Sequence, residues 1–162
     1  MRITDTHIYF YRGFLSNWVP RNLTIKFRGE IFSNSEQIFM YLKAMFFGDE
    51  DMAYNIIKYG KDPKIAKEFG GKVRYYYESV WETKREEMMY EAVLAKFTSD
   101  ESLKQKLLDT GNKILVEASP IDKIWGVMIA EDDDRILDEK NWKGRNLLGK
   151  VLMKVRDKLK QI

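Results

Sequence analysis

The chain has 162 residues, of which 44% are hydrophobic and 33% are charged. This length and composition predict a folded domain with its own hydrophobic core, and they exclude a disordered chain. Cysteine is absent, which excludes disulfides, thiolate metal sites and cysteine nucleophiles. A Ser-His-Asp triad or a histidine metal site would depend on His7, the single histidine.

The charge and hydropathy patterns limit the partners of the chain. The net charge of +3 comes from 28 basic and 25 acidic side chains. This balance is too even to indicate a protein that binds nucleic acid over much of its surface, although a local basic groove is still compatible with it. No apolar run reaches the roughly 18 residues of a transmembrane helix, and the N-terminus lacks the apolar region of a signal peptide. We therefore expect a soluble cytoplasmic protein without a membrane partner.

Short strands are predicted at three places in the chain. Residues 8–11 form a run of aromatic and β-branched side chains that is typical of a strand. Residues 23–27 and 31–32 predict a hairpin, because the first run alternates apolar and polar residues and Gly29 supplies the turn. A further apolar run at residues 114–116 also predicts a strand.

Helical periodicity covers most of the remaining chain. Helices are predicted at residues 33–47, 49–58, 63–69, 80–97, 103–109 and 145–160. An acidic loop is expected between residues 130 and 140. The predicted fold class is α+β: a mostly helical single domain over residues 1–162 with a small antiparallel β-sheet.

Two charged residues on the helix at residues 33–47 have both structural and functional interpretations. Ser33-x-x-Glu36 matches a capping box, in which the glutamate closes the helix N-terminus. A first-turn carboxylate is also held rigidly near the positive end of the helix dipole, ready to orient water or to stabilise positive charge. Lys43 follows seven residues later in an apolar segment, where it snorkels from the core, contacts an anion or offers a reactive amine.

The stretch EASPIDKIWG, residues 117–126, directly follows the predicted strand at residues 114–116. Asp122 suits a turn or a helix cap after Pro120. Trp125 suits core packing, but an indole beside Gly126 also suits the stacking of a planar base. Trp81 and Trp142 carry the same two alternatives.

Two loops have the composition of anion-binding or ribose-binding segments. The loop from Arg12 to Asn17 combines a glycine with polar side chains that suit phosphate or ribose hydroxyls, although turn chemistry explains Ser16 and Asn17 as well. The segment from Gly144 to Lys150 comes close to a phosphate-binding loop, but Val151 occupies the position that needs Ser or Thr, so we reject a P-loop.

Several short motifs follow one another along nearly the whole chain. They are Gly13-Phe14-Leu15-Ser16-Asn17, Phe32-Ser33-x-Ser35-Glu36, Met40-x-x-Lys43-Ala44, Pro63-x-x-Ala66-Lys67, Trp81-x-x-x-Arg85-x-x-x-Met89, Lys96-Phe97, Leu108-x-Thr110-Gly111, the run from Leu115 to Gly126, and Trp142-x-Gly144-x-Asn146-x-Leu148-Gly149. In this order the motifs resemble those of the NADAR (NAD and ADP-ribose-associated), or YbiA-like, proteins.

The resemblance implies an N-glycosidase, which cleaves the bond between a ribose anomeric carbon and a nitrogen base. It implies Glu36, Lys43 and Asp122 as the catalytic residues, with Asp122 and Trp125 facing Glu36 across the ribose. The implied substrate-binding residues are Arg12, Gly13, Ser16, Asn17, Trp81, Glu117, Ser119, Trp125, Gly126 and Asn146. Glu36 would activate water or a sugar hydroxyl, and Lys43 would contact the ribose or attack its opened anomeric carbon. Neither a cofactor nor a metal is expected.

The resemblance leaves the substrate open. Candidates are a small phosphoribosyl or ADP-ribosyl compound, including ribosylamino-pyrimidine phosphates of riboflavin synthesis, and ADP-ribosylated guanine in nucleic acid. Gly70-Gly71 stands where family members often have Gly-Arg, so a phosphate contact of the family is missing there. Val127-Met128-Ile129 stands in place of a glycine-containing turn, which predicts a bulkier wall near the base. A non-catalytic nucleotide-binding module and a nucleic-acid-binding protein remain as alternatives, and the oligomeric state is open.

Overall fold

A computed structural model describes residues 1–162 and contains seven α-helices, two small β-sheets and two short 3-10 helices. The chain forms two compact units. One consists of Asn17–Leu103, and the other combines Met1–Ser16 with Lys104–Ile162. The mostly helical α+β class predicted from the sequence is confirmed, and the extent of a single NADAR-like domain over residues 1–162 stays a prediction.

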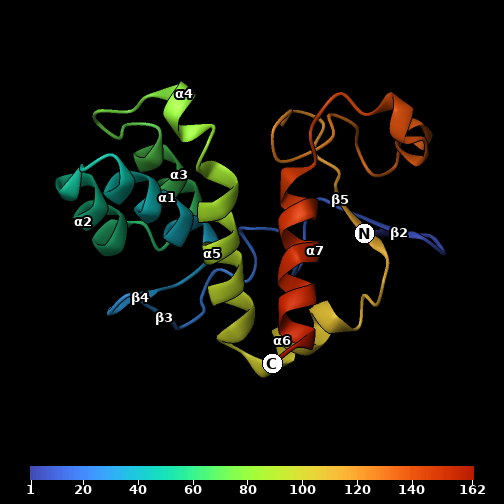
Figure 1. The fold of residues 1–162 in the computed structure, drawn as a ribbon, viewed down its shortest axis with the longest axis horizontal. Coiled ribbons are helices and arrows are strands. Elements are labelled where there is room, and N and C mark those ends of the chain that lie inside the picture. The colour runs from blue at the N-terminus through green and yellow to red at the C-terminus, as the bar shows by residue number, and fades with distance from the viewer. The chain divides into compact units, whose positions relative to one another are not determined.

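The unit of residues 17–103 is built around helix α1 (Figure 1). Its elements are β3 (Ile25–Phe27), β4 (Glu30–Phe32), α1 (Ser35–Phe46), α2 (Glu50–Tyr59), α3 (Pro63–Gly70), α4 (Glu78–Trp81) and α5 (Arg85–Thr98). α1 packs against α2, α3 and α5, which explains why apolar residues occur on nearly all of its sides. β3 and β4 pair antiparallel around Gly29, as predicted.

Close packing of α1 and α3 explains Gly70, the glycine that the Gly70-Gly71 pair shares with the Gly-Arg of the family, whereas a Cβ atom on Gly71 would make only ordinary contacts, with Glu68 O at 3.4 Å. A Cβ atom on Gly70 would lie 1.8 Å from Met40 Sδ and 2.9 Å from Met40 Cγ, so a larger residue there would force the Met40 side chain to move. Gly70 is buried in this contact. Its role is therefore helix packing.

The prediction of one helix over residues 80–97 is wrong. The chain forms the short helix α4, turns at residues 82–84, and begins again as α5 at Arg85. At the turn, Thr83 Oγ1 donates to Val80 O at 2.7 Å, and the Lys84 amide donates to Trp81 O at 2.9 Å. Hydroxyl side chains that bond to nearby backbone compete with a continuous helix, and the periodicity of the apolar residues does not reveal this break.

The other unit contains a three-stranded sheet in the order β1-β2-β5. Its elements are β1 (Arg2–Ile3), β2 (His7–Phe10), β5 (Ile114–Glu117), most of α6 (Glu101–Leu108), the 3-10 helices Asp134–Leu137 and Glu139–Asn141, and α7 (Leu147–Lys160). β1 and β2 are antiparallel, but β2 and β5 are parallel, which corrects the expectation of a purely antiparallel sheet. A parallel pair needs a long crossover, and here more than a hundred residues separate the two strands.

Asp49 fixes the segment that follows α3 to the N-terminus of α2. Its side chain is 1% exposed, and Oδ1 accepts the Met52 amide at 3.1 Å as the N-cap of α2. Arg74 Nη2 donates to Oδ1 at 2.7 Å, and the Arg74 amide donates to Oδ2 at 2.8 Å. The Arg74 side-chain bond, followed by the backbone bonds, lowers the pKa of Asp49 to about 2.

We expect Asp49→Asn to lower the free energy of unfolding by about 1–2 kcal/mol, because charge-assisted bonds to Arg74 are lost from a buried site. A depressed pKa stabilises the fold above the ordinary pKa of aspartate, and the gain disappears as the pH falls toward 2. Urea denaturation between pH 7 and pH 2 measures both effects. Asp51→Asn is the matched control, since Asp51 is 87% exposed and also pairs with Arg74. Equal losses in the two variants would contradict this role of Asp49.

Candidate active site

Glu36 lies in a buried polar cluster at the N-terminus of α1. Asn17 Nδ2 donates to Glu36 Oε2 at 2.7 Å, and the Glu36 amide donates to Asn17 O at 3.3 Å. Ser35 Oγ donates to Asn17 Oδ1 at 2.5 Å. Asn17 therefore holds the Glu36 carboxylate through a charge-assisted bond, close to the positive end of the helix dipole.

The capping-box hypothesis for Ser33 and Glu36 is wrong by one residue. Asn34 is the N-cap, and its Oδ1 accepts the Gln37 amide at 2.9 Å. Gln37 Oε1 in turn accepts the Ser33 amide at 2.8 Å. Because Asn34 and Gln37 close the helix, the Glu36 carboxylate is released from capping and bonds to Asn17.

Lys43 lies on the same helix, two turns after Glu36, and is half-buried. Its Nζ lies 4.5 Å from the centroid of the Tyr76 ring and forms no salt bridge within its unit. Burial lowers the pKa of the Lys43 amine, and the charge of Arg85 lowers it further, against opposing effects of Glu78 and Glu36. The structure thus combines a fixed carboxylate and an amine with a lowered pKa on one helix, and a reactive role of Lys43 stays a prediction.

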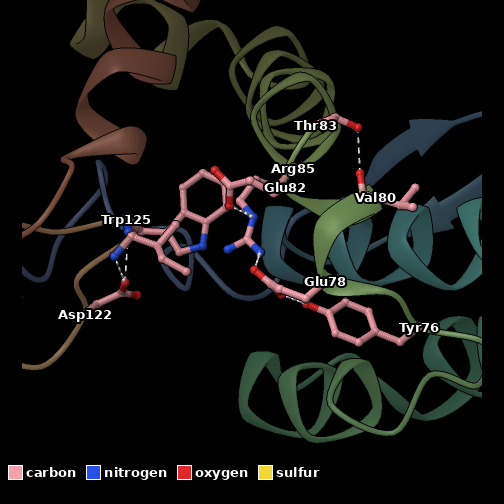
Figure 2. Close-up of polar contacts among 9 residues, drawn as sticks. Tyr76, Glu78, Val80, Glu82, Thr83, Arg85, Asp122 and Trp125 are labelled. Atoms are coloured by element: carbon pink, nitrogen blue, oxygen red, sulfur yellow. Dashed lines mark hydrogen bonds and ion pairs between the residues drawn. The ribbon is translucent and has the colours of Figure 1, made fainter.

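Tyr76 contacts this amine, and the charges of Glu78 and Arg85 act on it, although the sequence analysis did not indicate these residues as site residues. Tyr76 OH donates to Glu78 Oε2, and Arg85 Nη2 donates to Glu78 Oε1 at 2.6 Å. Arg85 Nε also pairs with Glu82 Oε2 at 3.3 Å (Figure 2). In the sequence, Arg85 belongs to the motif Trp81-x-x-x-Arg85, and this motif is the one signal that could have indicated Arg85 as a site residue.

Trp81 lies inside the unit of residues 17–103. It is buried and packs against three phenylalanine rings, with centroid distances of 5.6 Å to Phe39, 6.0 Å to Phe46 and 5.9 Å to Phe47. This environment agrees with the core-packing alternative. Contact between Trp81 and a base stays a prediction.

The stretch EASPIDKIWG forms two consecutive side-chain-capped turns in the other unit. Ser119 Oγ accepts the Asp122 amide at 3.1 Å and the Ile121 amide at 3.3 Å. Asp122 Oδ1 accepts the amides of Ile124 and Trp125 at 2.9 and 2.8 Å (Figure 2). No donor of the same unit reaches Asp122 Oδ2, so the turn uses one carboxylate oxygen and leaves the other for a ligand.

The atoms that lie close to Gly126 belong to the preceding loop of the same chain. A Cβ atom there would lie 2.8 Å from Ser119 Cβ and 3.1 Å from Asp122 O. The expectation that Val127, Met128 and Ile129 together form a bulkier wall near the base is not met. Val127 and Ile129 are buried in a core cluster with Tyr9, and Met128 alone is exposed. Met128 has φ +66°, a backbone conformation that favours glycine, so only this side chain of the three is available at the surface.

Asn146 joins the N-terminus of α7 to β5. Its Oδ1 accepts the Glu117 amide at 2.9 Å, and its Nδ2 donates to Leu115 O at 3.0 Å. The side chain is buried, and φ of +53° is a conformation that asparagine tolerates. These contacts make Asn146 a positioning residue for the end of β5, and a direct substrate contact stays a prediction, as it does for the half-buried Glu117.

The loop from Arg12 to Ser16 belongs to the same unit as Asp122. Gly13 has φ +84°, and its carbonyl accepts the Ser16 amide at 3.0 Å, so turn formation accounts for the glycine. Arg12 is exposed and forms no ion pair within its unit, so its guanidinium is available to an anion. Asn17, by contrast, lies in the other unit as the partner of Glu36. The predicted placement of Asp122 and Trp125 opposite Glu36 stays a prediction.

Two kinds of feature are missing from the structure. No group of three or more His, Asp or Glu side chains is arranged to hold a metal ion. None of the helices combines the length and the apolar character that a membrane crossing requires.

Comparison with known proteins identifies the family. The model of the NADAR domain matches residues 9–160 of the chain. The chain belongs to the NADAR domain family. An N-glycosidase of Acanthamoeba polyphaga mimivirus is 36% identical over 169 residues, which cover 98% of this chain and 99% of the relative.

Two further proteins extend the comparison. A riboflavin biosynthesis protein of Vibrio vulnificus is 30% identical over 98% of this chain, a match that spans 40% of the Vibrio protein. The solution NMR structure of YbiA from E. coli superposes with a TM-score of 0.76 at 30% identity, covering 99% of this chain and 88% of YbiA. The NADAR resemblance and the fold expected from it are therefore confirmed.

We expect Asn146→Gly to lower the free energy of unfolding by roughly 3 kcal/mol, because glycine keeps the backbone conformation but leaves a buried carbonyl and amide of β5 unpaired. Chemical denaturation of the substrate-free protein measures this loss. If Asn146 served only to bind substrate, stability would be unchanged and substrate affinity alone would fall.

Proposed function

We propose that this NADAR protein is an N-glycosidase that hydrolyses the bond between a ribose anomeric carbon and a nitrogen base. The observation that carries the proposal is the Glu36 carboxylate, fixed by Asn17 at 2.7 Å at the N-terminus of a helix that also bears Lys43. The family membership and the name of the mimivirus relative support the reaction class.

The proposed chemistry follows from how an N-glycosidic bond breaks. The electron pair of the bond leaves with the base nitrogen, which takes up a proton from solvent water, and positive charge develops on the ribose. A fixed carboxylate stabilises that charge without reorganisation and accepts the proton of the attacking water as its oxygen bonds to the anomeric carbon. We assign both tasks to Glu36.

Lys43 and Asp122 complete the proposed catalytic set. The lowered pKa of the Lys43 amine supports two roles, a contact to the ribose or attack on the anomeric carbon of the ring-opened ribose. In the second role the bond from that carbon to the base nitrogen breaks, the base leaves with the electron pair and takes up the proton that the attacking amine loses, and Lys43 Nζ remains bound to the carbon as an imine. The imine would then be hydrolysed to return the amine. Asp122, with Oδ2 outside the turn hydrogen bonds, would bind a ribose hydroxyl or stabilise the positive charge.

The proposed substrates carry a phosphate or diphosphate on the ribose. Arg12 is the candidate for an anion contact, because its guanidinium is exposed and outside any ion pair of its unit. Ribosylamino-pyrimidine phosphates and ADP-ribosylated guanine, free or in nucleic acid, are the substrate classes to test. A non-catalytic nucleotide-binding module is the alternative, and it predicts affinity for these compounds without release of a base.

We expect the purified protein to release free base from at least one member of this panel, detected by mass spectrometry. Glu36→Gln keeps an acceptor for Asn17 but removes the negative charge, so it should fold normally and lose at least about 100-fold in kcat. Glu91→Gln is a control on the protein surface, since Glu91 pairs with the exposed Arg28. Full activity of Glu36→Gln would overturn the assignment, and affinity without base release in the wild type would favour the binding module.

Asp122 offers a test that separates its turn from its charge. Asp122→Asn keeps the Oδ1 acceptor for the Ile124 and Trp125 amides, whereas Asp122→Ala removes the cap as well. We expect both variants to lose base release, but only Asp122→Ala to lose stability, by about 1 kcal/mol. Thermal unfolding and kcat/KM measure the two effects. Wild-type activity of Asp122→Asn would show that the carboxylate serves the turn alone.

A further inference from the structure

Lys43 needs a partner that holds its amine in one place. A lysine side chain has a flexible stem of four carbons, and it loses considerable conformational entropy when it is fixed in one rotamer. The amine makes no salt bridge within its unit, and its contact at 4.5 Å is with the face of the Tyr76 ring. A ring face attracts an ammonium group, so Tyr76 is the group that orients Lys43.

Tyr76 is itself held from two sides although it is 38% exposed. Its ring meets Phe47 edge-on, with centroids 5.3 Å apart, and its hydroxyl donates to Glu78 Oε2. Glu78 Oε1 accepts Arg85 Nη2 at 2.6 Å, and the Arg85 side chain is 6% exposed (Figure 2). A chain of contacts thus runs from a buried arginine through Glu78 and Tyr76 to the Lys43 amine.

We propose that Tyr76 and Glu78 are positioning residues that fix the Lys43 amine for catalysis, with Arg85 as their buried anchor. The catalytic part of this inference rests on the proposed function, whereas the positioning part concerns the free protein. Tyr76 acts through its ring face, and Glu78 acts by holding the ring and by offsetting the charge of Arg85.

The charged groups that face Lys43 determine the direction of the expected effects. Arg85 on α5 disfavours the ammonium, and Glu78 on α4 and Glu36 on α1 favour it. Removing the Tyr76 ring or the Glu78 charge therefore takes away a group that favours the charged form. Both changes should lower the pH at which Lys43 loses its proton.

The experiment measures how fast Lys43 is reductively methylated in the substrate-free protein at a series of pH values. Mass spectrometry of the peptide that contains Lys43 gives the rate, and the midpoint of the rate against pH marks the loss of the proton. The variants are Tyr76→Leu, Tyr76→Phe and Glu78→Gln. Tyr77→Leu is the matched control, because Tyr77 is 68% exposed and makes no ring contact. We expect midpoints lower by about half a pH unit in Tyr76→Leu and Glu78→Gln. Tyr76→Phe, which keeps the ring, should shift less, and Tyr77→Leu should leave the midpoint in place.

The same variants are then assayed for base release. Loss of positioning should lower kcat about tenfold or more with little change in KM, since a misplaced group costs rate more than affinity. Unchanged Lys43 midpoints in Tyr76→Leu and Glu78→Gln would overturn the inference. Absence of base release from the wild type would instead contradict the proposed function, while the midpoints, which need no substrate, would still decide the positioning role.

Discussion

The bond from Asn17 to Glu36 is the constraint from which the rest of the candidate site follows. A buried carboxylate is costly unless donors surround it, and here Asn17 and the N-terminal end of α1 supply that environment. Because Asn34 and Gln37 cap the helix, Glu36 has no part in capping. The carboxylate is therefore held in one place, which supports the proposed role of Glu36 in stabilising positive charge on a ribose.

A second constraint acts two turns further along α1. Burial and Arg85 lower the pKa of Lys43, while the charges of Glu78 and Glu36 limit that effect. Opposing influences of this kind adjust an amine between its charged and neutral forms, which suits either an anion contact or covalent attack. In the other unit, the Asp122 carboxylate uses one oxygen for structure, since Oδ1 accepts the Trp125 amide and closes the turn.

The sequence predicts local structure well and non-local pairing poorly. The hairpin at Gly29 and the helices α1 to α3 follow from short-range periodicity and turn residues, which is why they were predicted nearly to the residue. The parallel pairing of β2 with β5 and the bond between Asn17 and Glu36 join distant parts of the chain, and no periodicity encodes them. Tyr76 and Glu78 read as ordinary surface residues, because their importance comes from Arg85 and Lys43.

The most direct test of charge development on the ribose is a competitive isotope effect on base release, with deuterium at the anomeric carbon. It should be measured in the wild-type protein with a slowly converted substrate, so that substrate binding does not mask the effect. If the bond to the base breaks ahead of water attack, protium reacts faster than deuterium, because the carbon flattens in the transition state. Equal rates for the two isotopes, with the chemical step rate-limiting, would contradict an oxocarbenium-like transition state and with it the central role of Glu36.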